Sequence, residues 1–141
     1  MDQKQPAQTT EERRRPSILI ASQSGRMRDS LRLLLATAPG VEVIGCADDS
    51  ASALAQVAGL CPALLLLDAN LPGENVLSVL KRIRDDGCRP RCLVLVDTQR
   101  QQGDALAAGA DAALIKGYAT AKLFEVITEL TGKRETLAEQ V

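Results

Sequence analysis

The run Leu64–Leu67 and the residues after it constrain the fold more than any other stretch of this 141-residue chain. Four consecutive leucines leave no polar face, so a strand here must be covered on both sides, like a central strand of a parallel sheet. The run ends at Asp68, and Pro72-Gly73 then turns the chain. A carboxylate after a buried strand is costly unless it lies beyond the carboxyl ends of the strands, where α/β proteins place their sites. Asp68 is therefore a candidate functional residue, with capping of the next helix as the alternative.

Short apolar segments alternate with amphipathic segments along the chain. Strands are predicted at Ser17–Ala21, Val41–Cys46, Leu64–Leu67, Cys92–Val96 and Ala112–Ile115. Helices are predicted at residues 27–35, 50–58, 76–85, 104–108 and 120–131, where most of the apolar residues recur at helical spacing. Alternation of this kind builds a parallel sheet with helices on both faces. We therefore expect a single α/β domain, a doubly wound (βα)5 sandwich with strand order 2-1-3-4-5 and the second strand near an edge.

Both ends of the sequence are polar. Residues 1–16 lack hydrophobic periodicity and are predicted to form a flexible arm. Gly132 is predicted to end the last helix, which leaves residues 17–131 as the folded domain and 132–141 as a polar tail. No apolar run approaches the roughly 20 residues of a membrane span, and the start has no secretory signal pattern. These features predict a cytoplasmic protein without a membrane partner.

Composition argues against several classes of site. The net charge of −1 gives no basic surface for nucleic acid, and the absence of histidine excludes Ser-His-Asp and Cys-His catalysis. No two cysteines form a CxxC pair, which argues against zinc, so we interpret them as small core residues of a reduced protein: Cys46, Cys61, Cys88 and Cys92. Aromatic residues make up 1% of the chain, which argues against stacking on bases or on a flat cofactor.

Polar and charged residues follow four of the predicted strands. Asp68, Asp97 and Lys116 end the third, fourth and fifth strands, and Ser22 and Gln23 follow the first. In the order 2-1-3-4-5 these strands are neighbours, so the five side chains share one edge. An ammonium group lowers the pKa of a nearby carboxylate, and an ionised Asp can accept a phosphoryl group or bind a metal. A purely structural Lys–Asp pair is the alternative. We expect Lys116 to bridge Asp68 or Asp97, as the only cation at this edge.

Two longer motifs resemble the receiver domain of two-component response regulators. The resemblance covers nearly the whole predicted domain, and its most specific parts are Leu64–Gly73 and Ala108–Lys116. It implies a flavodoxin-like fold in which Asp68 is the candidate phosphoryl acceptor and Lys116 neutralises the acyl phosphate. It also implies that the carbonyl of Asn70 helps to hold Mg²⁺, so Asp68 and Asn70 are candidate metal ligands. The implied role is a non-enzymatic module of a phosphorelay, with a sensor kinase or an output protein as partner and homodimerisation as an option.

The predicted pocket departs from the family pattern. Receivers normally carry two acidic residues after the first strand, where this chain has Ser22 and Gln23, and neutral side chains should weaken Mg²⁺ binding. The fourth strand normally ends in Thr or Ser, but Asp97 stands here, followed by Thr98, and a carboxylate repels a phosphoryl group. Ala113 occupies the aromatic switch position, and the fourth helix looks clipped. We therefore expect an atypical receiver with weak or no Mg²⁺-dependent phosphorylation.

Three alternatives compete with this interpretation. An ordinary phosphorylated receiver would tolerate these substitutions. The loop Ser22–Gly25 is similar to the phosphate loop of flavodoxin-type FMN domains, although only Tyr118 is placed to flank a flavin. A phosphatase of the haloacid dehalogenase type would use Asp68 as nucleophile but needs a second acid where Asn70 stands. We expect no bound FMN. Because no DNA-binding segment follows the domain in this sequence, we expect the output to pass through protein partners, through another chain, or through a longer form of this protein.

Overall fold

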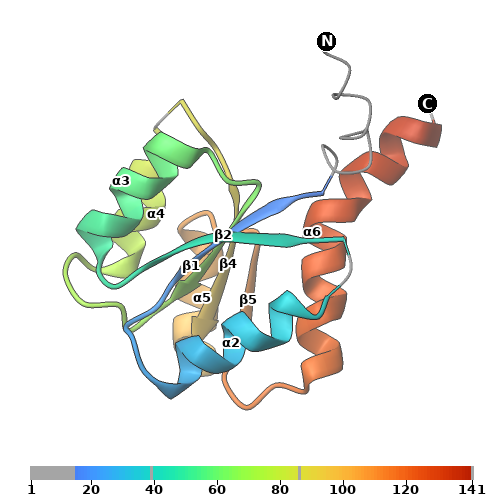
Figure 1. Cartoon of the computed structure of the whole chain (residues 1–141). Helices are drawn as coiled ribbons and strands as arrows, with labels where there is room; N and C mark the ends of the chain where they lie inside the picture. Colours follow the sequence, from blue (N-terminus) through green and yellow to red (C-terminus); the bar gives the residue numbers. More distant parts are fainter. Residues whose placement is uncertain (1–14, 39, 86, 141) are drawn as a thin grey trace, which may run out of the picture.

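The computed structural model describes residues 15–38, 40–85 and 87–140, with side chains up to residue 132 (Figure 1). Its strands are β1 (Ser17–Ala21), β2 (Glu42–Ala47), β3 (Leu64–Asp68), β4 (Arg91–Val96) and β5 (Ala112–Ile115). Its helices are α2 (Arg26–Ala36), α3 (Ser50–Leu60), α4 (Val76–Arg84), α5 (Gln99–Ala107) and α6 (Thr120–Gln140). The predicted N-terminal arm lies almost entirely outside the described residues.

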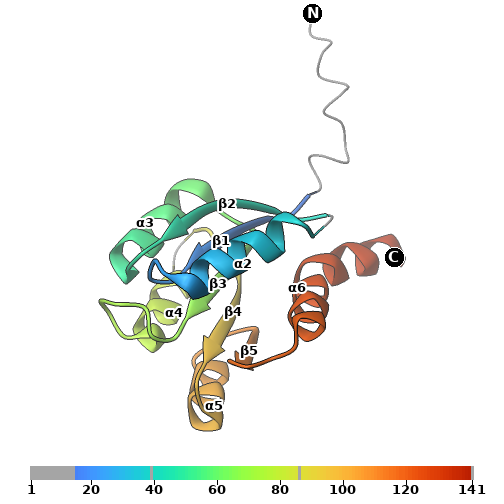
Figure 2. The same ribbon diagram turned by 60° about the horizontal axis from the view of Figure 1, so that its bottom comes forward.

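The described strands form one parallel sheet in the order β2-β1-β3-β4-β5, which confirms the predicted doubly wound fold. The leucine strand β3 lies at its centre, and β2 lies at an edge, as its mixed polarity indicates. Helices α3, α4 and α5 cover one face of the sheet, and α2 and α6 cover the other (Figures 1 and 2). Each of the four pairs of neighbouring strands is parallel, so the carboxyl ends of the strands meet at one edge of the sheet.

The leucines of β3 divide between the two faces of the sheet. Leu65 and Leu67 pack under α3, α4 and α5, whereas Leu64 and Leu66 pack under α2 and α6. Each is at most 1% exposed, because successive residues of a strand point to opposite faces and both faces are covered. Truncating any one of them to alanine should cost about 2–5 kcal/mol. The uninterrupted run of leucines in β3 is thus explained by burial of both faces of the strand.

Three of the described helices, α3, α4 and α5, begin at residues whose side chains bond to the first turn, and in α4 the side-chain oxygen of Asn75 accepts from the backbone N–H of Leu77. Asp49 caps α3, with its carboxylate accepting from the backbone N–H of Ser52 at 2.8 Å. Thr98 caps α5 in a reciprocal capping box with Gln101. This helix therefore starts at Gln99, not at Asp104 as predicted, and it is a continuous helix of 9 residues, not a clipped one. The prediction was wrong because it followed the alanine-rich stretch and overlooked the Thr-x-x-Gln signal.

The last helix is longer than predicted. It continues through Gly132 to Gln140, so the predicted end at Gly132 was wrong. A single glycine costs a helix only about 1 kcal/mol relative to alanine, and no proline follows it. The packing of Leu123, Ile127 and Leu130 against the sheet holds the first part of this helix. Within the described residues, no helix has both the length and the apolar character needed to cross a bilayer.

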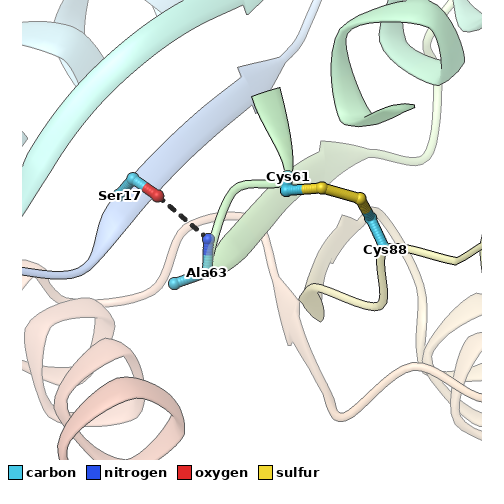
Figure 3. Close-up of a disulfide and its surroundings, with 4 residues drawn as sticks. All are labelled: Ser17, Cys61, Ala63 and Cys88. Carbon is cyan, nitrogen blue, oxygen red and sulfur yellow. Dashed lines mark hydrogen bonds between the residues drawn. A yellow bond between two sulfur atoms is a disulfide. The ribbon is translucent and has the colours of Figure 1, made fainter. Parts of the chain in front are cut away.

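The sequence suggested that all four cysteines are reduced core residues, and for two of them this interpretation was wrong. Cys61 and Cys88 form a disulfide, with their Cα atoms 5.3 Å apart (Figure 3). Cys61 caps the C-terminus of α3 before β3, and Cys88 lies in the loop before β4. Because β3 and β4 are adjacent and parallel, the segments that enter them meet at the same edge of the sheet. The interpretation holds for Cys92, which is buried, and for Cys46, which is half-buried against the core.

Candidate functional site

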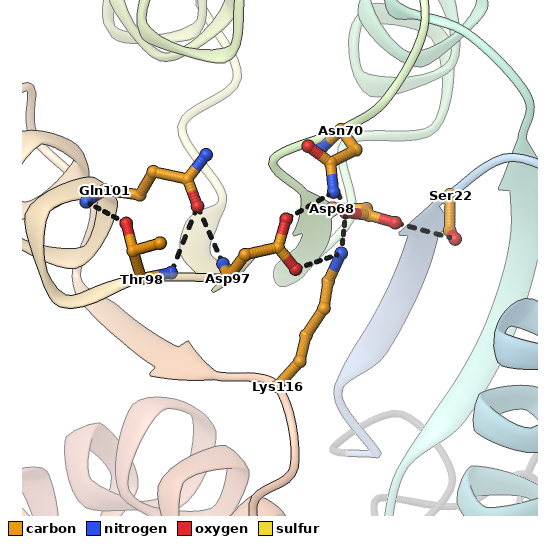
Figure 4. Close-up of polar contacts among 7 residues, drawn as sticks. All are labelled: Ser22, Asp68, Asn70, Asp97, Thr98, Gln101 and Lys116. Carbon is orange, nitrogen blue, oxygen red and sulfur yellow. Dashed lines mark hydrogen bonds and ion pairs between the residues drawn. The ribbon is translucent and has the colours of Figure 1, made fainter.

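The predicted acceptor Asp68 is the last residue of β3 and lies at the carboxyl edge of the sheet. It is only 8% exposed, although the residue is ionisable. One carboxylate oxygen, Oδ1, accepts from the backbone N–H of Asn70 at 2.9 Å, and the other, Oδ2, accepts from the Ser22 hydroxyl at 3.5 Å (Figure 4). A buried carboxylate is stable only when such donors or a counter-charge are present.

The ammonium group of Lys116 supplies that counter-charge. Its Nζ lies 2.9 Å from Oδ1 of Asp68 and 3.4 Å from Oδ1 of Asp97, so one cation bridges two carboxylates (Figure 4). The prediction that Lys116 bridges Asp68 or Asp97 is confirmed for both. Burial of the ammonium group acts to lower the pKa of Lys116, but the hydrogen bond and charge of Asp68, followed by those of Asp97, raise the pKa above its ordinary value of 10.5.

The carboxylate of Asp97 is the outer member of this group. Its side chain is 46% exposed, and its Oδ2 accepts from the side-chain amide of Asn70 at 2.7 Å. This hydrogen bond is the largest cause that holds the pKa of Asp97 below its ordinary value, and the charge of Lys116 acts in the same direction. The amide nitrogen of Asn70 therefore faces a carboxylate of the pocket, while its backbone N–H binds Asp68.

The two neutral residues after β1 lie differently. Ser22 is 2% exposed and contributes its hydroxyl to Asp68, while its backbone N–H donates to Ala47 at 3.0 Å. Gln23 is exposed, and among the described residues the polar partners of the Asp68 carboxylate are Ser22, Asn70 and Lys116, not Gln23. The sequence predicted both as pocket residues, but only Ser22 reaches the carboxylate. Their positions follow from β1, which ends beside β3 in register with it.

Thr98 does not direct its hydroxyl to the acceptor. Its Oγ1 accepts from the backbone N–H of Gln101 at 3.1 Å, as part of the α5 cap. Gln101 completes this capping box, because its side-chain oxygen accepts from the backbone N–H groups of Asp97 and Thr98 at 2.7 and 3.2 Å (Figure 4). Gln101 was not predicted as a site residue, although the Thr-x-x-Gln spacing of a capping box was readable in the sequence.

A second cation, which was not predicted from the sequence, lies at the carboxyl edge of the sheet. Arg28, in the first turn of α2, pairs with Asp48, the residue after β2. The guanidinium side chain is only 17% exposed. The expectation that Lys116 is the only cation at this edge was therefore wrong, since every helix that follows a strand of the sheet begins at the carboxyl edge.

The donor set of the pocket matches Mg²⁺ poorly. Among the described residues, no three His, Cys, Asp or Glu side chains are grouped so that they could hold a metal ion. Mg²⁺ takes an octahedral shell of oxygen ligands from carboxylates, carbonyls and water. Oδ1 of Asp68, one of the two predicted ligand residues, already bonds to Lys116 and to the backbone N–H of Asn70.

Comparison with known proteins agrees with the predicted receiver fold. The profile of the response regulator receiver domain matches residues 18–128. A protein-glutamate methylesterase/protein-glutamine glutaminase of Myxococcus xanthus is 36% identical over 130 residues, which are 88% of this chain and 37% of that protein. The nitrate/nitrite response regulator protein NarL of Escherichia coli is 27% identical over 125 residues, 87% of this chain and 58% of that protein. This chain therefore spans only part of either relative.

Solved structures have the same fold. The response regulator domain of Thermotoga maritima CheB superposes with a TM-score of 0.75 at 22% identity, covering 83% of this chain and 96% of that one. A CheY-like receiver domain protein of Methanospirillum hungatei superposes with a TM-score of 0.74 at 24% identity, covering 86% and 97%. Together with the match over residues 18–128, these similarities show that the chain belongs to the response regulator receiver domain family.

Proposed function

We propose that this chain is an atypical receiver of a two-component phosphorelay, with weak or no Mg²⁺-dependent phosphorylation at Asp68. The observation that carries the proposal is the bridge from Lys116 to both Asp68 and Asp97. In this arrangement the ammonium group of Lys116 offsets the charge of the acceptor carboxylate and of Asp97. The ordinary phosphorylated receiver is the alternative that the experiment below tests.

Charge at the end of β1 supports weak Mg²⁺ binding. The family pattern places two acidic residues there, whereas this chain places Ser22 and Gln23. A hydroxyl and an amide carry no charge to offset the cost of dehydrating Mg²⁺, so the affinity should fall. Phosphoryl transfer depends on neutralising the charge of the transferred group, so a weaker metal site also slows acceptance of phosphate.

The position of Asp97 opposes phosphorylation directly. In the family pattern a Thr or Ser hydroxyl at this point donates to the phosphoryl group. Here a carboxylate stands there and shares its counter-cation, Lys116, with the acceptor. A phosphoryl group on Asp68 would bring further negative charge beside Asp97 and compete with it for one ammonium group.

The signalling face also lacks the usual movable side chain. Ala113 occupies the aromatic switch position in β5 and is 8% exposed. The side-chain amide of Gln102 in α5 donates to the carbonyl of Ala113 at 2.8 Å. This bond joins helix to strand at the point where a receiver normally changes a rotamer. A fixed contact of this kind supports recognition by partners in one conformation.

Protein partners are the proposed output. A sensor kinase or an output protein, with a homodimer as a further option, suits a receiver whose relatives include response regulators. The receiver domain itself is non-enzymatic, and the methylesterase activity printed for relatives is a property of those longer proteins. We propose a cytoplasmic location, and the net charge of −1 supports neither nucleic acid nor an anionic membrane as partner.

Intact mass after treatment with a small-molecule phosphodonor and Mg²⁺ tests the proposal. The wild-type chain should gain little phosphate, and Asp68→Asn, the matched control, should gain none. Asp97→Thr restores the hydroxyl of the family pattern, so it should gain more phosphate than wild type, and Asp68→Asn in that background should abolish the gain. Rapid, complete and Mg²⁺-dependent modification of wild type at Asp68 would show that the chain is an ordinary receiver.

A further inference from the structure

We infer that Cys61 and Cys88 form a reversible redox site, in which a disulfide opens to two thiols and closes again by exchange with small thiol and disulfide compounds. The site lies where the chain enters β3 and β4, at the amino edge of the sheet (Figure 3). Asp68 ends β3 and therefore lies at the opposite, carboxyl edge. The redox site involves none of the pocket residues, so it does not depend on whether Asp68 accepts a phosphoryl group.

The geometry brings two sequence-distant cysteines together. They are separated by 27 residues in the chain, and their Cα atoms lie 5.3 Å apart, within the range that a disulfide bridges. Cys61 is held in the left-handed conformation, with φ of 44°, at the C-terminus of α3, and its backbone N–H donates to Val57. Because the two residues lie shortly before the neighbouring strands β3 and β4, the fold itself supplies their proximity.

Exposure distinguishes this pair from the buried thiol of Cys92. Cys61 is exposed and Cys88 is half-buried, so an external thiol or disulfide can approach the bond. Cys92 is 4% exposed, and burial, followed by the charge of Asp111, raises its pKa to about 12. A thiol of that kind supplies almost no thiolate, the form that attacks disulfides. Cys92 should therefore take no part in the exchange between Cys61 and Cys88.

The reaction balances as two thiol–disulfide exchanges. Starting from the reduced protein, the thiolate of the exposed Cys61 attacks one sulfur of a small disulfide such as oxidised glutathione, whose S–S bond breaks and releases one thiolate. The thiolate of Cys88 then attacks the Cys61 sulfur of the mixed disulfide and displaces the second thiolate. The protein loses two electrons and two protons, and the small disulfide gains them as two thiols. An excess of a small dithiol reverses both steps.

Oxidation closes a covalent loop around the candidate acceptor. The segment between the two cysteines contains β3, Asp68 and α4. A cross-link over a loop of this length restricts the unfolded chain and should lower the unfolding equilibrium constant on the order of a hundredfold. It also ties the end of α3 to the loop after α4, so local opening of α4 should become rarer. In the proposed cytoplasmic location, disulfides are usually transient and redox-sensing, which supports a reversible bond.

The test uses the full chain treated with oxidised glutathione or with dithiothreitol. Thiols are alkylated under native conditions and then in denaturant, and counted by intact mass. Oxidised protein should expose two thiols fewer than reduced protein, and dithiothreitol should restore both without denaturant. Cys61→Ser and Cys88→Ser should lose the difference, and Cys46→Ser should retain it.

Two further readouts test the consequence of closure. The urea midpoint should rise on oxidation of wild type but not of Cys61→Ser. Amide hydrogen exchange should slow in α4, while exchange in α6, which lies outside the loop, serves as the internal reference. The inference is overturned if four thiols are alkylated after glutathione treatment. It is equally overturned if the bond resists dithiothreitol in the folded protein, or if closure changes neither the midpoint nor exchange in α4.

Discussion

Replacing Lys116 by methionine tests whether the pocket is an electrostatic unit. Methionine keeps much of the length of the side chain and removes its charge. The carboxylate of Asp68, whose side chain is 10% exposed, would then keep the hydrogen bonds from Ser22 and the backbone of Asn70 but lose its cation. Asp97 would lose the same cation, and two carboxylates that shared one ammonium group would face the same space unpaired.

The structure sets the expected magnitude between two known limits. Exposed ion pairs contribute about 0–1 kcal/mol, and removing one partner of a buried pair costs about 3–5 kcal/mol. The side chain of Lys116 is 24% exposed and that of Asp68 is 10% exposed, which is close to the buried case without reaching it. We therefore expect Lys116→Met to lower the free energy of unfolding by about 1–3 kcal/mol at neutral pH.

Urea unfolding measured by far-ultraviolet circular dichroism provides the assay, because the chain has no tryptophan for fluorescence. The matched control is Lys122→Met. The Nζ atom of Lys122 lies 3.9 Å from Oε1 of Glu125, and the two side chains are 54% and 59% exposed. Removing this exposed ion pair should therefore lower the free energy of unfolding by at most about 0.5 kcal/mol. The double variant Lys116→Met with Asp97→Thr should recover part of the loss, since it removes one of the two opposed carboxylates.

One result would refute this reasoning. If Lys116→Met unfolds at the same urea concentration as wild type, and if Asp97→Thr changes nothing in that background, then the bridge contributes no net stability. The pocket would then be a set of side chains that meet by topology alone, and the proposal of an atypical receiver would lose the observation that carries it.

Three further predictions follow from the same residues. Titration with Mg²⁺, followed by the amide shifts of Ser22, Gln23 and Asp68, should not reach saturation at physiological concentrations, and saturation there would contradict the weak-metal proposal. FMN mixed with the protein should keep its fluorescence, since only Tyr118 is placed to flank a flavin, and quenching would favour the flavodoxin-type alternative. Because the pKa of Lys116 is raised, the stability difference between wild type and Lys116→Met should be fully present from neutral pH up to about pH 10.5 and should decline as the pH rises through the folded-state pKa; a difference lost already near neutral pH would show that the ammonium group is not its source.

The sequence alone determined the fold and most of the candidate pocket. A run such as Leu64–Leu67 fits only a strand buried on both faces, and its repetition with helical segments leads to a parallel sheet. Once the strands are parallel and neighbouring, the residues that end them must meet at one edge. That topological rule placed Asp68, Asp97, Lys116 and Ser22 together without any knowledge of side-chain conformation.

Only the tertiary structure decided how those groups pair. Whether Lys116 reaches one carboxylate or both, and which end of the Asn70 amide faces Asp97, depends on rotamers chosen by packing among elements that lie far apart in the sequence. The Cys61–Cys88 disulfide likewise could not be predicted from the sequence, because 27 residues separate two cysteines that share no motif. Periodicity reports which face of a segment is buried, whereas contacts between loops depend on how the packed strands place their ends.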